Sequence, residues 1–334
     1  MPDPRAANPE PHAPTALIPA IQHRIDHFRQ QQRVRAGSLI MSVFGDAVLP
    51  RGGRIWLGSL IRLLEPLGLN ERLVRTSVFR LGKEKWLRAD TRGRRAEYVL
   101  TDSGRLRFEE ASRHIYSSHA PIWDRRWRLI LVVGELDARQ RDRLRQALQW
   151  QGFGNLGSDC FVHPSTHLEA AYDALEADGL GDMLGCLLPL LAADARITLT
   201  ASDADLVARA WNLDRLAESY AAFVSGYLPI LAELRRDRRA RLEPEEAFLA
   251  RVLMIHDYRR LLLRDPELPE VLLPADWPGQ SARMVCRELY RRLAEPSELH
   301  LDAHMRLADG TAPERLEDGF ERFPADDPLV SISL

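Results

Sequence analysis

Cysteine is scarce in this chain, and so are long hydrophobic runs. The 334 residues include three cysteines, Cys160, Cys186 and Cys286, which is an odd number at wide spacings. That usage argues against a disulfide framework and is typical of a reducing compartment. The longest apolar run, Met183 to Ala193, is interrupted by Pro189, and a helix that crosses a bilayer needs about 20 residues. We therefore expect a soluble cytoplasmic protein with no membrane partner.

Lysine is almost absent, because Lys83 and Lys85 are the only two and arginine supplies nearly all of the positive charge. Part of this arginine abundance reflects a coding bias, so a lone arginine is weak evidence for a site. The net charge is only -2, and the global balance indicates no class of partner. The distribution is more informative, since residues 35–107 hold 15 Lys and Arg against 7 Asp and Glu. A local positive surplus of this kind can steer a polyanion.

A short basic segment that starts at Asn70 is the most informative part of the chain. Asn70 is a good N-cap and Glu71 places an acid in the first turn, so the sequence predicts a helix from here to Lys85. With helical periodicity, one side of this helix is mainly apolar and the other is cationic. The first side holds Val74, Ser77, Val78, Leu81 and Lys85, and the second holds Arg72, Arg75, Thr76, Phe79 and Lys83.

The neighbours of this helix complete a motif. Upstream, residues 56–64 predict a short amphipathic helix that ends near a proline and a glycine at 66–68, so the pair is a helix-turn-helix. Downstream, residues 86–89 and 96–100 predict two strands. The hairpin between the two strands carries three arginines and a glycine. Such a hairpin beside a helix-turn-helix is a wing.

Helix and wing together predict double-stranded DNA as the partner. Arginines on a helix that fits the major groove can pair with guanine, and arginines on a hairpin can neutralise phosphates or enter the minor groove. A solvated helix face and a polar loop would also explain the charges, but here two basic elements flank one compact motif. The residues predicted to contact DNA are Arg72, Arg75, Thr76, Phe79, Arg80 and Lys83 on the helix, and Arg92, Arg94 and Arg95 on the hairpin.

The patterning of the whole chain predicts an α+β protein of several domains. Residues 1–33 are expected to be a disordered or polar N-terminal arm, with five prolines among the first 14 residues and a Gln-rich end that predicts a solvated helix. Residues 34–120 hold the winged helix-turn-helix. Residues 121–200 alternate strands and helices, which predicts a ferredoxin-like α/β domain. Residues 201–295 are helical, and residues 296–334 are a tail.

Some element limits follow from single signals. The apolar run from Leu129 to Val133 predicts a buried strand, and Asp137 is expected to cap the helix that follows it. A further apolar strand is predicted from Met183 to Leu191. The last helix is predicted from Ser281 to about Leu293.

Two cofactor-like patterns are present, and neither predicts a site. The segment Gly152–Gly157 matches G-x-G-x-x-G, but it follows a predicted helix and precedes a strand, the reverse of what phosphate binding at a helix N-terminus requires. Histidines and a cysteine occur at ligand-like spacings, yet no pair has the glutamate of H-E-x-x-H. We expect no metal and no cofactor. The sets considered are Cys160, His163 and His167; His23 and His27; and His300 and His304.

A band of polar and aromatic residues near the end of the third C-terminal helix is the candidate site for a small molecule. Arginines beside a histidine and aromatic walls suit an anionic ligand that also has an apolar part. A salt-bridged helix face would explain the same spacing. The candidate effector-binding residues are His256, Tyr258, Arg259, Arg260 and Arg264, with Trp277 from the following loop.

Several longer runs, in order along the chain, carry a family resemblance. They are Ser38–Asp46, Ile55–Ile61 and Leu69–Leu81 near the N-terminus, and Ile255–Arg260, Arg264–Pro269, Leu273–Gly279 and Cys286–Arg291 near the C-terminus. Together they resemble the PaaX-type regulators, the repressor family of the phenylacetic acid degradation operon. The resemblance implies a winged-helix domain, a central domain like the CRISPR-associated Cas2 fold, and a helical C-terminal domain. It also implies a homodimeric repressor whose DNA affinity falls when the effector, phenylacetyl-coenzyme A, binds.

Two other classes stay open at this point. One is an enzyme, such as a metal-dependent nuclease or a coenzyme A thioester hydrolase, but the sequence has no G-x-S-x-G and no Walker loop. We therefore expect no catalytic residues. The other is an activator, because the sign of regulation depends on where the operator lies relative to the promoter.

Overall fold

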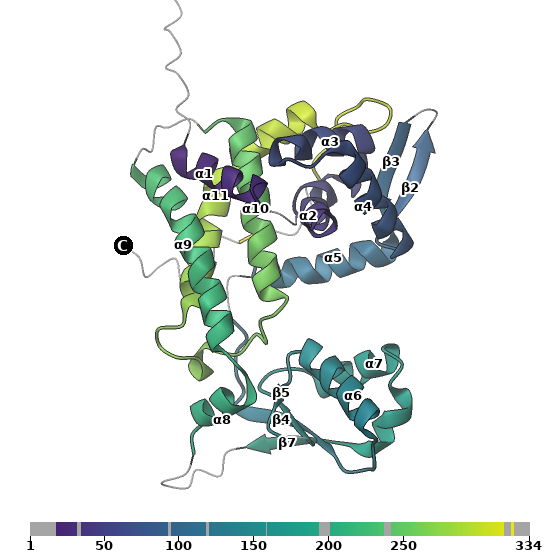
Figure 1. Cartoon of the computed structure of the whole chain (residues 1–334), viewed down its shortest axis with the longest axis vertical. Helices are drawn as coiled ribbons and strands as arrows, with labels where there is room; N and C mark the ends of the chain where they lie inside the picture. The colour runs from purple at the N-terminus through teal and green to yellow at the C-terminus, as the bar shows by residue number, and fades with distance from the viewer. Residues whose placement is uncertain are drawn as a thin grey trace, which may run out of the picture.

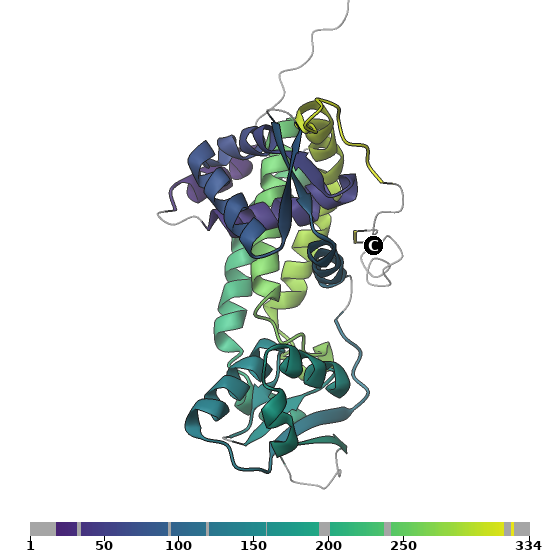
Figure 2. The same ribbon diagram turned by 90° about the vertical axis from the view of Figure 1, so that its right-hand side faces the viewer.

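The computed structural model describes residues 18–31, 35–92, 95–117, 120–157, 159–193, 201–236, 242–316 and 322–323. A large, mainly helical body carries a smaller α/β domain at one end (Figure 1). The view turned by 90° shows the same separation, with the small domain below the helices (Figure 2). The fold is therefore multidomain and α+β, as the sequence predicts.

The winged helix-turn-helix is present with a third strand. Its sheet has the order β1-β3-β2, and both pairings are antiparallel. β2 and β3 are longer than predicted, because their pairing extends to Arg92 opposite Arg95. The elements are α2 (Ala36–Val43), η1 (Phe44–Val48), η2 (Leu49–Arg51), β1 (Arg54–Trp56), α3 (Leu57–Leu64), η3 (Glu65–Leu67), α4 (Glu71–Lys83), β2 (Leu87–Arg92), β3 (Arg95–Leu100) and α5 (Asp102–Ile115).

The start of α4 follows from its cap and from the turn before it. Gly68 has a φ of 82°, which a residue without Cβ adopts readily, and this reverses the chain after η3. The side chain of Asn70 then accepts a hydrogen bond of 2.9 Å from the amide of Leu73. The helix ends at Lys83, earlier than predicted, and Lys85 lies beyond it at a φ of 60° with an exposed side chain. The buried side of α4 is Val74, Ser77, Val78 and Leu81, as predicted.

The central domain has the ferredoxin-like order of strands. Its sheet order is β5-β6-β4-β7 with all neighbours antiparallel, and α6 and α7 cover one face. The segment that matched G-x-G-x-x-G supplies the short edge strand β5, so it is not a phosphate loop at a helix start. The apolar strand begins later than predicted, because Gly181–Cys186 form the 3₁₀ helix η4. The elements are β4 (Arg126–Val132), α6 (Ala138–Trp150), β5 (Gly154–Asn155), β6 (Cys160–His163), α7 (Leu168–Ala177) and β7 (Leu187–Ala193).

The C-terminal helices divide between the two bodies. α8 packs with the segment around η5 on the second face of the central sheet, where Val207 and Leu268 meet Trp127 and Val162. α9, α10 and α11 form the long bundle of the larger body. α11 ends at His304 instead of near Leu293, and it continues through an internal proline. The elements are α8 (Asp203–Ala210), α9 (Asp214–Arg236), α10 (Pro244–Leu262), η5 (Glu270–Leu272) and α11 (Pro278–His304).

The N-terminal helix α1 (Pro19–Arg29) packs against this bundle, although the sequence predicted a solvated helix here. Ile21, Ile25 and Phe28 are buried. Their spacing of four and then three residues gives a narrow apolar stripe, which the surrounding glutamines and charges obscure in the composition. α1 is therefore a structural part of the large body.

The winged helix and the C-terminal bundle share one hydrophobic core, and a buried ion cluster lies between them. Arg251 of α10 binds the Asp46 carboxylate at 2.7 Å and reaches Glu298 of α11 at 2.7 Å. The Tyr116 hydroxyl donates to Asp46 at 2.6 Å, and Arg51 reaches Glu298 at 2.6 Å. Burial alone would raise the pKa of Asp46, but Arg251, Arg322 and the hydrogen bonds outweigh it and lower that pKa.

The segment after α11 fixes the wing. The amide of Trp56 donates to Arg306 O at 3.0 Å, which adds a backbone bond to β1. Beside it, the amide of Ala308 donates to the buried Glu97 carboxylate at 2.9 Å. Residues that the sequence assigned to a tail thus hold the hairpin that is expected at DNA.

Candidate nucleic-acid interface and ligand cavity

The cationic side of α4 is open to solvent. All six side chains predicted to contact DNA on this helix are exposed. Phe79 is the most telling of them, since 61% of this large aromatic residue is accessible and Lys83 Nζ lies 4.8 Å from its ring centre. An exposed aromatic ring among cations suits contact with a thymine methyl and the neighbouring phosphates.

Some groups on this face have partners within the protein. Arg75 donates from Nη2 and Nε to Glu71 Oε1 at 2.6 and 2.7 Å, one helical turn away. Both side chains are more than half exposed, and pairs of that kind contribute little to stability. The Thr76 hydroxyl donates to Arg72 O at 2.8 Å. These contacts are local, so a ligand can replace them without unfolding the helix.

The wing lies beside α4 (Figure 1). Arg95 is exposed, but its guanidinium stacks on Trp56 at 4.9 Å and donates to Ala308 O at 3.1 Å. Arg92 is the last residue of β2 and pairs with Arg95 in the backbone register. Arg94, which the sequence also placed at DNA, lies outside the described residues.

The residues predicted to bind the effector do not form one group. His256 is buried, with Nδ1 3.1 Å from the Ser42 hydroxyl, and burial lowers its pKa to about 4. A neutral imidazole in this position cannot hold a phosphate by charge. Arg259 donates to the Ser38 carbonyl and hydroxyl at 3.0 and 2.8 Å. Both side chains therefore join α10 to α2 of the winged helix.

Two further members of that set are also inside the bundle. Tyr258 is 2% exposed and packs on Phe223, and Trp277 packs edge-on against Tyr220 at the start of α11. Arg260 and Arg264, by contrast, are exposed and line a cavity. The structure thus separates two accessible arginines from four residues that support the packing.

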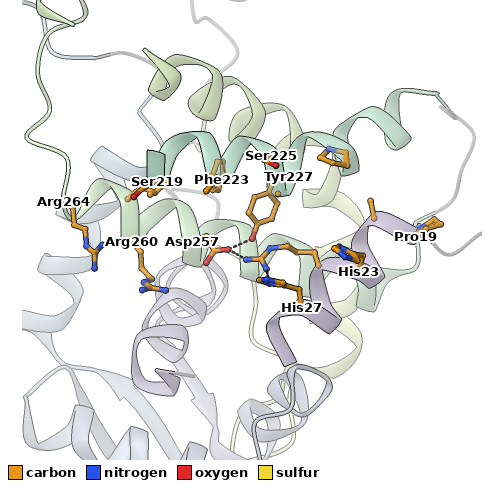
Figure 3. A pocket seen from close by; sticks show the side chains of 16 residues that line it. Pro19, His23, His27, Ser219, Phe223, Ser225, Tyr227, Asp257, Arg260 and Arg264 are labelled. Atoms are coloured by element: carbon orange, nitrogen blue, oxygen red, sulfur yellow. Dashed lines mark hydrogen bonds and ion pairs between the residues drawn. The ribbon is translucent and has the colours of Figure 1, made fainter. Parts of the chain in front are cut away.

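That cavity lies between α1, α9 and α10 and has a volume of about 930 Å³. Figure 3 shows Arg260 and Arg264 side by side at one end, with His23 and His27 of α1 toward the other. The wall between them is mainly apolar and comes from α9. It includes Ala222, Phe223, Tyr227 and Pro229.

A polar triad lies at the middle of the cavity. Arg24 of α1 forms an ion pair with Asp257 of α10, and the Tyr227 hydroxyl donates to the same carboxylate at 2.7 Å. Arg24 also contacts the ring of His27 at 3.0 Å. The guanidinium of Arg24 is therefore already paired with other residues of the protein. Within the part of the chain that the structure describes, neither Arg260 nor Arg264 has a side-chain hydrogen bond or ion pair.

The histidines at ligand-like spacings also differ in where they lie. His163 is buried and its Nδ1 accepts from the amides of Ser165 and Thr166 at 3.1 and 2.9 Å, so it caps a turn. Its burial lowers its pKa to about 4. His23 and His27 line the cavity, a role that the sequence analysis missed. The sequence did contain a sign of this role. His23 and His27 are four residues apart, on the polar side of a helix that also has an apolar stripe.

The second helix of the helix-turn-helix, α4, is exposed and cationic, and the hairpin lies against it. Together with the separate ligand-sized cavity, these features are those of a winged-helix DNA-binding regulator. Three family models match the chain: PaaX-like protein at residues 35–104, the PaaX protein central Cas2-like domain at 120–188, and the PaaX-like protein C-terminal domain at 211–303. The chain is 39% identical over 302 residues to the transcriptional repressor PaaX of Escherichia coli (strain K12), covering 90% of this chain and 93% of that one. The chain belongs to the PaaX family of transcriptional repressors.

The fold also occurs in a solved structure, the uncharacterized protein Rv0674 from Mycobacterium tuberculosis. The two chains are 24% identical with a TM-score of 0.51, and the match covers 79% of this chain and 97% of that one. In the described ranges, no helix combines the length and the apolar character that a membrane span requires.

Proposed function

We propose that this chain represses genes of aromatic catabolism, those for phenylacetate, and that an aryl-acetyl-coenzyme A, phenylacetyl-coenzyme A, releases it from its operator. The observation that carries the proposal is the open cationic face of α4 with the wing beside it, in a chain that belongs to a family of repressors. The ligand cavity in the C-terminal bundle adds support, since a regulated repressor needs a place for its effector.

The exposed cationic side of α4 supports the following mode of DNA recognition. A homodimer places two copies of this helix in successive major grooves of a near-palindromic operator, about 34 Å apart. Arg72 and Arg75 pair with guanine edges, and Phe79 lies against a thymine methyl. Arg80, Lys83 and the arginines of the wing hold phosphates, which sets the register without reading sequence.

Release follows if the effector prefers another arrangement of the dimer. A ligand shifts an equilibrium between two states only by its difference in affinity for them. Phenylacetyl-coenzyme A would favour a state in which the two α4 helices no longer match the half-site spacing. The operator affinity then falls although no side chain at DNA has changed.

A gel shift on the DNA upstream of the genes beside this one tests the proposal. We expect a shifted band with the full-length protein, its loss on addition of phenylacetyl-coenzyme A, and little effect of free phenylacetate or free coenzyme A. A band that survives saturating phenylacetyl-coenzyme A would reject the effector. Absence of any sequence-specific band would reject the operator.

The same samples test the enzymatic alternative. Labelled duplex incubated with Mg²⁺ or Mn²⁺ should stay intact, and phenylacetyl-coenzyme A should not release free thiol. Cleavage or thiol release that grows with protein concentration would favour a metal-dependent nuclease or a thioester hydrolase instead.

A further inference from the structure

We propose that the cavity between α1, α9 and α10 binds the acyl-coenzyme A effector, and that α1 transmits its occupancy to the helix-turn-helix. The inference rests on the proposed function, because it gives the effector of that function a site and a route. It assigns a role to α1, which precedes the residues matched by the three family models.

The free positive charge of the cavity suits the phosphates of the ligand. Arg260 lies in the last turn of α10 and Arg264 follows the end of that helix, and both side chains are exposed and point the same way (Figure 3). A guanidinium donates two parallel hydrogen bonds to a phosphate, which makes arginine well suited to phosphate recognition. The two arginines have another explanation, because cations near the C-terminus of α10 interact favourably with its helix dipole. That explanation does not account for the cavity with an apolar wall beside them.

The apolar wall suits the acyl group. Phe223 and Tyr227 of α9 and Leu261 of α10 line the space between the two charged ends. Ala222 and Gly226 are exposed on the same side of α9, and their small size leaves the groove wide. A volume of about 930 Å³ lies within the range of small-molecule sites. An anion with an aromatic or aliphatic part therefore matches both portions of the lining.

The cavity exists only while α1 is docked. His23, Arg24 and His27 form its third wall, and the ion pair of Arg24 with Asp257 holds α1 against α10. Gln22 and Glu246 form a second polar contact between the same two helices. A ligand that fills the space contacts all three helices, so its binding must alter the free energy of docking α1.

The far end of α1 contacts the DNA module. Arg29, the last residue of α1, donates from Nε to the carbonyl of Pro66 at 2.8 Å. Pro66 lies in η3, which leads through Gly68 to Asn70, the N-cap of α4. A displacement of α1 therefore reaches the recognition helix through a single hydrogen-bonded turn. This contact is the link through which coupling between the cavity and α4 would run.

Calorimetric titration of the full-length protein with phenylacetyl-coenzyme A tests the site. In the double variant Arg260→Ala/Arg264→Ala we expect the dissociation constant to rise at least about tenfold, because two charge-assisted contacts are lost. The control Arg209→Ala/Arg292→Ala removes two exposed arginines that do not line the cavity and should bind like the wild type.

A second pair of variants tests the cavity without changing charge. Ala222→Trp fills the groove and should weaken binding, whereas Ala221→Trp places the same ring on an adjacent exposed position that does not line it. All four variants should shift the operator like the wild type, which shows that they are folded. Equal affinities in the cavity variants and their controls would overturn the site.

The variant Arg29→Gln tests the route. It should bind phenylacetyl-coenzyme A and operator like the wild type, yet need at least about tenfold more ligand to release the DNA. Release at the wild-type ligand concentration would overturn the role of α1. If the wild-type protein does not bind phenylacetyl-coenzyme A, both the proposed effector and its proposed site are rejected. If the wild type and the cavity variants bind it equally well, the effector stands and only the cavity is rejected as its site.

Discussion

Arg75 on α4 forms an ion pair with Glu71 on the side of the helix that we propose contacts DNA. The pair is exposed enough for Arg75 to exchange Glu71 for a base edge. At the opposite extreme, Asp46 is 1% exposed and its contacts are with charged or phenolic groups of other elements. The exposed pair of Arg75 with Glu71 is therefore easily broken, whereas the buried pair of Asp46 with Arg251 is costly to break.

Replacing Arg75 by Ala is expected to cost about 1 to 3 kcal/mol in binding to the cognate operator, because a paired contact to a base is lost. Fluorescence anisotropy with the operator and with an unrelated duplex measures it. The loss should be small on the unrelated duplex. Equal losses on both would show that Arg75 contacts phosphate instead of bases.

Replacing Asp46 by Ala is expected to destabilise the protein by about 3 to 5 kcal/mol, because Arg251 would keep Glu298 but lose the buried carboxylate that its Nε binds. Since the pKa of Asp46 is lowered on folding, its stabilisation is present above its ordinary value of 3.8 and is lost as the pH falls below that value. Urea unfolding between pH 5 and pH 3 should therefore show a smaller loss of stability with pH in Asp46→Asn than in the wild type. Parallel pH profiles would contradict this.

Among the elements, α1 is the one whose composition says least about its place in the structure. Its composition is polar, yet Ile21, Ile25 and Phe28 form the stripe that docks it on the bundle. One side of the same helix lines the cavity and its end reaches Pro66. α4 differs, because its cap, its apolar side and its cationic side are all local in sequence.

Replacing Ile25 by Asp is expected to undock α1, since a carboxylate would be buried in an apolar contact. Operator binding should stay within about threefold of the wild type, because α4 and the wing keep their own supports. Release by phenylacetyl-coenzyme A should be lost. Hydrogen exchange should show α1 unprotected, and Gln30→Asp, on the exposed end of the same helix, should leave both properties intact.

At the scale of the whole molecule, the DNA module and the C-terminal bundle are one unit although more than 80 residues of sequence separate them. Their buried residues form a single cluster, whereas the central domain has clusters of its own. A state change in the bundle therefore alters packing that the winged helix shares. The central domain lies apart at one end (Figure 2).

This arrangement predicts two cooperative units. In hydrogen exchange with increasing denaturant, helices α2, α4, α10 and α11 should lose protection in a common step, and strands β4 and β6 in a different one. If α2 and α4 opened at a lower denaturant concentration than α10 and α11, the shared core would not act as one unit.

The sequence predicted most accurately those features whose causes are local. The cap at Asn70, the apolar side of α4 and the hairpin all appear where the pattern placed them. The strand order of the central domain also agrees with the predicted fold. The residues predicted to bind the effector could not be placed in the same way, because helical spacing alone does not tell which side of α10 faces α2 and which faces the cavity.

By itself, the sequence determined the helix that starts after Asn70 and the wing, because caps, periodicity and turn residues act within a few positions. The family and the layout of its domains followed from the resemblance of longer runs along the chain to the PaaX-type regulators. Only the tertiary structure decided that α1 docks and that His256 and Arg259 face α2 while Arg260 faces a cavity. It also decided that Asp46 joins two distant parts of the chain. Burial and pairing of this kind depend on which surfaces meet, and residues far apart in the chain supply the two sides.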